Sequence, residues 1–90
     1  MTSLAGKVVI VTGASQGLGE AIARAAHSAG AAVVLAGRRA ELIEALAGEL
    51  GTAIAVAGDV TNETDRLHLV QAAIDAYQRI DVLVNNAGIA

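Results

Sequence analysis

Residues 12–19 read Thr-Gly-Ala-Ser-Gln-Gly-Leu-Gly and place three glycines between an apolar run and a stretch of helical periodicity. One glycine lets the chain turn sharply off a strand, another lets the backbone approach a phosphate, and a third allows close helix–strand packing. A helix beginning near Gly17 would point free N–H groups and its positive dipole end at that phosphate. The stretch therefore predicts a dinucleotide-phosphate loop; the alternative is an ordinary glycine-rich turn.

Four apolar runs alternate with three helical patterns along the chain. The runs cover residues 7–11, 32–36, 52–57 and 82–85 and lack in/out alternation, so we expect strands buried on both faces. Each helical pattern has an apolar face expected to pack on these strands. The three faces are Leu18, Ile22, Ala25, Ala26 and Ala29; Leu42, Ile43, Leu46 and Leu50; and Leu67, Val70, Ile74 and Tyr77.

Glycine and capping residues support this division. Gly30 and Gly51 would end the first two helices, and Thr61-Asn62 would begin the third. Strands that alternate with helices predict right-handed crossovers and a parallel sheet. We therefore expect a single α/β domain over residues 1–90: a Rossmann-type parallel sheet, β-α-β-α-β-α-β with strand order 3-2-1-4, forming the N-terminal part of a doubly wound fold.

Composition excludes several classes of function. A net charge of −3 argues against a nucleic-acid surface, and the absence of Cys excludes disulfides and thiolate metal sites. We expect no metal site. The N-terminus has no signal-peptide pattern, and no apolar run approaches the roughly 20 residues that span a bilayer. The expectation is a soluble cytoplasmic protein that does not bind membranes.

Two further segments resemble a known family when taken with the glycine loop. Asn85-Asn86-Ala87-Gly88 directly follows the fourth apolar run, and Asp59 follows the third. Together the three motifs resemble the short-chain dehydrogenase/reductase family, in its classical type. The resemblance covers the whole chain, and it corresponds only to the N-terminal, coenzyme-binding part of such a protein.

The end of the second apolar run bears on the choice of coenzyme. NAD-binding folds carry an acidic residue about 20 residues past the glycines, and NADP-binding folds carry an arginine nearby. Here Gly37 takes the acidic position and Arg38 and Arg39 follow it. We therefore expect NADP (NADPH) to be preferred, with NAD less favoured, although Gln16 stands where many NADP-type relatives have a basic residue. The alternative is a solvated arginine pair screened by Glu41 and Glu44.

The resemblance also implies roles for single residues. Asp59 would accept a hydrogen bond from the adenine amino group and the Val60 N–H would reach a ring nitrogen, unless Asp59 only caps the following turn. Asn85 would mainly hold the sheet together. The full set of expected coenzyme contacts is Gly13, Ser15, Gln16, Gly17, Leu18, Gly19, Arg38, Arg39, Asp59, Val60, Asn86, Ala87 and Gly88.

No catalytic residue is expected in this chain. Carbonyl reduction needs a proton donor, in the family a Tyr four residues before a Lys, whereas Tyr77 is followed at that spacing by Asp81. Tyr77 should lie far from the coenzyme, and His27 and His68 lie on separate helices. The chain is thus interpreted as the coenzyme-binding fragment of an NADP(H)-dependent oxidoreductase that interconverts alcohols and ketones or aldehydes, inactive alone.

Two alternatives remain open. One is a stand-alone nucleotide-binding module without activity, and the other is a different Rossmann enzyme such as a nucleotide-sugar epimerase or a methyltransferase. In either case, the fourth apolar run, residues 82–85, forms an unpaired sheet edge. We expect self-association through this edge or through the surface that the missing half of the fold would cover.

Overall fold

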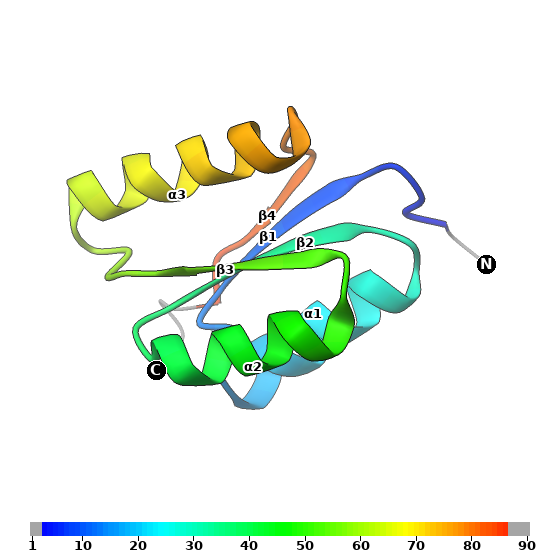
Figure 1. Cartoon of the computed structure of the whole chain (residues 1–90), viewed down its shortest axis with the longest axis horizontal. Helices are drawn as coiled ribbons and strands as arrows, with labels where there is room; N and C mark the ends of the chain where they lie inside the picture. Colours follow the sequence, from blue (N-terminus) through cyan, green and yellow to red (C-terminus); the bar gives the residue numbers. More distant parts are fainter. Residues whose placement is uncertain (1–2, 87–90) are drawn as a thin grey trace.

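The computed structural model describes residues 3–86 and alternates strands with helices, as the sequence predicts (Figure 1). Each element begins or ends within two residues of its expected position. The order is β1 (Val8–Thr12), α1 (Gly17–Ser28), β2 (Ala32–Gly37), α2 (Ala40–Leu50), β3 (Ala53–Ala57), α3 (Glu63–Tyr77) and β4 (Val82–Val84).

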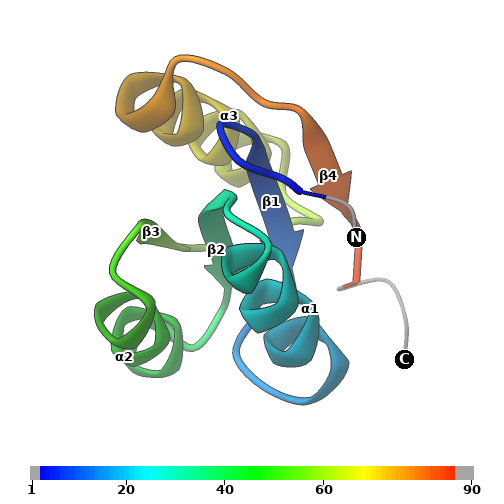
Figure 2. The same ribbon diagram turned by 90° about the vertical axis from the view of Figure 1, so that its right-hand side faces the viewer.

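The four strands form one parallel sheet in the order β3-β2-β1-β4, which confirms the predicted Rossmann-type topology. The chain crosses the sheet in one direction from β1 to β3 and then returns past β1 to β4. Since parallel crossovers are right-handed, this reversal moves the connecting helix to the other face. Accordingly, α1 and α2 cover one face and α3 covers the other (Figure 2).

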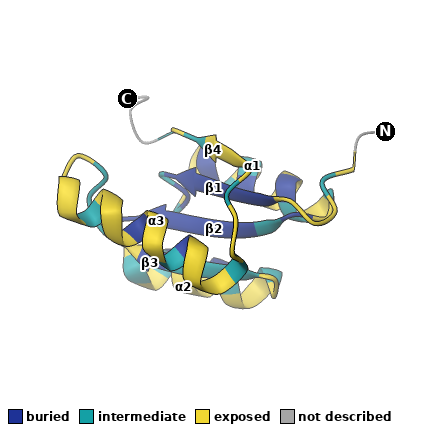
Figure 3. Cartoon of the chain, turned by 90° about the horizontal axis from the view of Figure 1, so that it is seen from above, coloured by how far each residue is buried: buried dark blue, intermediate teal, exposed yellow. Residues whose placement is uncertain are grey.

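Two apolar cores lie on the two faces of the sheet. Val9, Val11, Val33 and Leu35 point toward α1 and α2, whereas residues such as Ile10 point toward α3. Because successive side chains of a strand alternate between faces and both faces are covered, β1 and β2 are buried almost throughout (Figure 3), and apart from Thr12 their side chains are apolar. The two central strands therefore contribute side chains to both apolar cores, and they position the loops that follow them.

The outer strands are less buried than their apolar sequences suggested. The expectation that every strand is buried on both faces is wrong for β4, whose Leu83 is 61% exposed, and for most of β3. Each of these strands has a paired neighbour on one side only within residues 3–86. An apolar run predicts a strand but does not establish what covers it.

Two helical faces also differ from the prediction. In α1 the buried residues are Gly19, Ala23 and Ala26, and Leu18 is 59% exposed. In α3 the buried residues are Leu69 and Ala73, while Leu67, Val70 and Ile74 are exposed. The sheet supports only one flank of α3, so within residues 3–86 the larger apolar stripe beside that flank is left exposed. For α2, burial of Ile43 and Leu46 confirms the predicted face.

Helix ends follow the predicted signals. Gly30 and Gly51 have φ of 105° and 91° after the first two helices, in the left-handed region that favours glycine. Asn62 is the N-cap of α3, and its side chain accepts a hydrogen bond from the Asp65 N–H. No helix within residues 3–86 is both long enough and apolar enough to span a bilayer.

Candidate functional site: the carboxyl edge of the sheet

The glycine loop joins β1 to α1 and adopts a backbone that other residues would not tolerate. Gly13 and Gly17 have φ of 63° and 61°. Gly19 lies so close to the start of the loop that a Cβ there would sit 2.0 Å from the Gly13 carbonyl oxygen. Gly13 and Gly17 therefore allow the backbone conformation of the turn, and Gly19 allows α1 to pack directly against it.

The loop is tied to two neighbouring strands. The Ala14 N–H donates to the Ala36 carbonyl oxygen of β2 at 3.1 Å, and the Asn86 amide Nδ2 donates to the Gly13 carbonyl oxygen at 3.2 Å. Gln16, the N-cap of α1, makes no side-chain capping bond. Within residues 3–86 no side chain caps the N-terminus of α1, and the uncapped N–H groups of a helix N-terminus suit an anion.

The end of β2 carries the two arginines beside the loop. Gly37 is buried, and a Cβ on it would lie 3.3 Å from Ile43 Cγ2 and 3.8 Å from Ser15 Cβ. The chain then leaves the sheet, so Arg38 is exposed, with 73% of its side chain accessible, and Arg39 becomes the N-cap of α2. Both arginine side chains are therefore open to solvent at this edge.

Each arginine already has a carboxylate partner. Arg38 Nη2 lies 3.4 Å from Asp59 Oδ1, and Arg39 Nε lies 3.1 Å from Glu41 Oε1. The Arg38 pair forms because the ends of β2 and β3 are neighbours in the sheet. The predicted strand order thus brings two expected site residues from different loops into contact.

Asp59 organises the turn after β3. Its Oδ1 accepts hydrogen bonds from the Thr61 hydroxyl at 2.7 Å and the Thr61 N–H at 2.9 Å. These bonds, followed by the charge of Arg38, lower the pKa of the Asp59 carboxyl below its usual value. The capping interpretation of Asp59 therefore describes part of its geometry, although the N-cap of α3 is Asn62. Val60 follows, and its carbonyl oxygen accepts from Arg66 at 2.9 Å.

The two asparagines after β4 have different partners. The Thr12 hydroxyl lies 3.2 Å from Asn85 Oδ1 and 3.3 Å from the Val84 carbonyl oxygen, so Asn85 joins β4 to the end of β1. Asn86 instead donates to the Gly13 carbonyl oxygen of the glycine loop, a contact that sequence analysis does not predict. The expected contacts Ala87 and Gly88 lie outside the described residues.

These segments share one edge because the carboxyl ends of parallel strands meet there. The glycine loop, the arginines, Asp59–Val60 and Asn86 follow β1, β2, β3 and β4 in turn. The described edge offers a glycine cradle with no room for a Cβ at Gly19, a start of α1 that its N-cap side chain leaves uncapped, and exposed guanidinium groups. It fits the pyrophosphate and ribose of a dinucleotide.

Other polar groups lie away from this edge. Asp81, which the sequence did not single out, accepts from the Val8 N–H at the opposite end of β1. Arg24 of α1 bridges Glu20 and Glu49, joining α1 to α2. Tyr77 ends α3 and packs against the core on that face; partial burial raises the pKa of its hydroxyl. Residues 3–86 hold no cluster of His, Asp or Glu suited to a metal ion.

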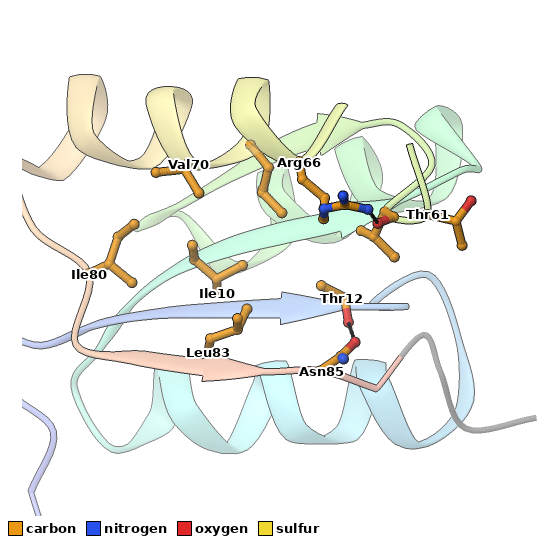
Figure 4. Close-up of a pocket in the computed structure, with 10 residues that line it drawn as sticks. Ile10, Thr12, Thr61, Arg66, Val70, Ile80, Leu83 and Asn85 are labelled. Atoms are coloured by element: carbon orange, nitrogen blue, oxygen red, sulfur yellow. Dashed lines mark hydrogen bonds between the residues drawn. The ribbon is translucent and has the colours of Figure 1, made fainter. Parts of the chain in front are cut away.

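A groove of about 350 Å³ lies between α3 and the β1–β4 pair (Figure 4). Ile10, Val70, Ile80 and Leu83 form its apolar body, and Thr12 and Asn85 lie at one end. The groove is on the face of the sheet that α3 covers. Val60 and Asn85 also line it, so it adjoins the carboxyl edge described above.

Comparison with known proteins identifies the family. The short chain dehydrogenase family model matches residues 7–90. An uncharacterized oxidoreductase of Methylorubrum extorquens is 47% identical over 99% of this chain and 38% of its own length. Serine 3-dehydrogenase of Agrobacterium fabrum is 46% identical over 91% of this chain and 33% of its own length. The chain belongs to the short-chain dehydrogenase family, whose members are oxidoreductases that bind nicotinamide dinucleotides.

A solved structure agrees with this assignment. The 3-ketoacyl-(acyl-carrier-protein) reductase of Brucella melitensis, in complex with NADH, superposes with a TM-score of 0.88 at 40% identity. The match covers 90% of this chain and 34% of that protein. The chain thus spans between a third and two fifths of the length of the relatives named here.

Proposed function

We propose that this chain is the coenzyme-binding part of an NADP(H)-dependent oxidoreductase that interconverts alcohols and ketones or aldehydes. The observation that carries the coenzyme choice is the end of β2, where buried Gly37 leaves no acidic side chain and exposed Arg38 and Arg39 follow. A carboxylate at this position would repel a 2′-phosphate, whereas a guanidinium binds it through paired hydrogen bonds.

The remaining contacts are proposed from the same edge. The pyrophosphate lies against Gly13–Gly19, where exposed Gly17 leaves backbone accessible and Gly19 allows α1 to pack against the loop. Ser15, Gln16 and Leu18 flank it. Asp59 and Val60 hold the adenine, and Asn86 lines the adenosine while fixing Gly13. The coenzyme contacts expected at Ala87 and Gly88 belong to the same proposal.

The coenzyme supplies the hydride that is exchanged with the carbonyl carbon of a substrate. This chain's residues bind and orient it. No described side chain at the carboxyl edge is proposed as the proton donor, since Tyr77 lies at the far end of α3. We therefore propose that these 90 residues bind coenzyme without turnover, and that substrate and proton donor contacts come from other parts of a longer protein.

Titration of the intact chain with NADPH and NADH tests the proposal. We expect tighter binding of NADPH, because only NADPH presents a dianion to Arg38. Arg38→Gln should weaken NADPH binding by about tenfold and change NADH binding by less than about twofold. Arg66→Gln, a matched loss of charge on α3, should leave the ratio of the two affinities unchanged. Equal affinities in the parent chain would contradict the NADP assignment.

A further inference from the structure

The two arginines proposed for the 2′-phosphate are neutralised within the protein. Arg38 is paired with Asp59 and Arg39 with Glu41, so four side chains carry two positive and two negative charges. In these pairs Arg38 Nη2 donates to Asp59 Oδ1, and Arg39 Nε donates to Glu41 Oε1. A phosphate arriving here meets guanidinium groups that already have carboxylates bound, and no net positive charge from this cluster.

The two carboxylates are held differently. Asp59 is fixed in its turn by both bonds from Thr61, so its position does not depend on Arg38. Glu41 stands in the first turn of α2 with 66% of its side chain exposed. A glutamate carboxyl is ionised at neutral pH, and its own N–H and then Arg39 lower its pKa further. Glu41 is thus charged, exposed and bound to the arginine that a phosphate would need.

The sequence offered Glu41 and Glu44 equally as partners of the arginines, and the structure separates them. Glu41 contacts Arg39, whereas among the described residues Glu44 makes no ion pair or side-chain hydrogen bond. Both are exposed glutamates of the same helix. One of them can compete directly with a phosphate for a guanidinium group, and the other contributes only its distant charge.

We propose that Glu41 is a specificity-determining residue, whose carboxylate competes with the 2′-phosphate for Arg39 and so narrows the preference for NADPH over NADH. This inference rests on the proposed function, because it presumes that a 2′-phosphate binds beside Arg38 and Arg39. In the bound state, Arg38 supplies most of the phosphate contact. Arg39 joins it only when Glu41 gives way.

The competition acts on one coenzyme only. NADPH must displace the Glu41 carboxylate from Arg39 or accept its repulsion, while the 2′-hydroxyl of NADH meets neither penalty. Exposed ion pairs are weak, so the effect is modest. Replacing Glu41 by Gln should therefore raise the ratio of NADPH to NADH affinity about two- to fivefold, through NADPH alone.

The test compares Glu41→Gln with Glu44→Gln in the intact chain, measuring dissociation constants for NADPH and NADH by calorimetric or fluorescence titration. Both variants remove one negative charge from the surface of α2, so their difference isolates the contact with Arg39. We expect the ratio to rise in Glu41→Gln and to stay near the parent value in Glu44→Gln. The difference should shrink near 1 M salt, where the screening length falls to about 3 Å.

Failure of this inference and failure of the proposed function give different results. If the parent prefers NADPH and Arg38→Gln removes that preference, but the two glutamate variants behave alike, Glu41 does not set specificity. If the parent binds both coenzymes equally and Arg38→Gln changes nothing, the NADP assignment itself is wrong. Arg39→Gln adds a check, because removing Arg39 should abolish the effect of Glu41→Gln.

Discussion

At the scale of single residues, the site depends on where side chains are absent. The glycine spacing predicted the loop, because strand, turn and helix followed in the required order. It did not predict that the Asn86 amide would hold the Gly13 carbonyl oxygen, since residues 73 positions apart share no local pattern. Nor did it pair Arg38 with Asp59, although the predicted strand order placed both at adjacent strand ends.

Gly19→Ala tests how tightly the loop is packed. A Cβ there would lie 2.0 Å from the Gly13 carbonyl oxygen and 2.7 Å from Asn86 Nδ2, so the loop must move. We expect a loss of about 2 kcal/mol or more in the free energy of unfolding, measured in urea, with weaker coenzyme binding. Gly48→Ala is the control, because nothing lies within 4 Å of that Cβ on α2. It should stabilise by about 0.5–1 kcal/mol, and similar losses in both variants would contradict this account.

At the scale of elements, periodicity predicted which segments are helices and strands, but not which faces are covered. Ile43 and Leu46 of α2 pack as expected because β2 and β3 lie beneath them. Leu67 and Val70 of α3 do not, because no element of the described chain covers that flank. An apolar stripe on a helix indicates that this face favours burial. Whether a strand or helix covers it depends on the tertiary arrangement, which the stripe does not predict.

The joint between β1 and β4 gives a pH prediction. Asp81 Oδ2 accepts from both Arg79 Nε and the Val8 N–H, each at 2.8 Å. Arg79 first, and then the Val8 N–H, lower the pKa of Asp81 below its ordinary value of 3.8. Because the folded-state pKa is the lower one, the stabilisation is complete above the unfolded-state value and is lost as pH falls through the folded-state value.

Urea unfolding between about pH 7 and about pH 2 measures this contribution. The parent chain should be more stable than Asp81→Asn near neutral pH, and the gap should close below about pH 4 as the carboxyl protonates. Asp75→Asn on exposed α3 is the control and should differ little from the parent throughout. If the difference in free energy of unfolding between the parent and Asp81→Asn stayed constant down to about pH 2, the charge of Asp81 would not contribute to stability.

At the scale of the whole molecule, most of the exposed large apolar side chains within residues 3–86 belong to α3 (Leu67, Val70 and Ile74) and β4 (Val82 and Leu83), whereas Leu18 lies on α1. Val70 and Leu83 line the groove between α3 and β4 (Figure 4). An unpaired strand edge next to an apolar groove favours association between chains. We propose that the 90-residue chain self-associates through this surface unless another part of a longer protein covers it.

Sedimentation of the chain at micromolar concentration tests the proposal. We expect dimers or larger species, and Leu67→Lys combined with Leu83→Lys should shift them toward monomer by placing charges on the shared surface. Leu18→Lys is the matched control for Leu83→Lys alone, because Leu18 is about as exposed (59% against 61%) but lies on α1, which covers the other face of the sheet (Figure 2). A monodisperse parent monomer, or equal effects of both changes, would overturn the assignment of this surface.

The position of β1 in the middle of the sheet has a consequence for how the protein is made. The Val8 N–H donates a hydrogen bond to the Asp81 carboxylate, which lies 73 residues later in the chain and is therefore synthesised later. At synthesis rates of about 5–20 residues per second, about 4–15 s separate the two on the ribosome. During that interval β1 can pair with β2 while its other edge stays open. Nascent chains are therefore most vulnerable to aggregation before β4 emerges, and chaperone binding should peak in that window.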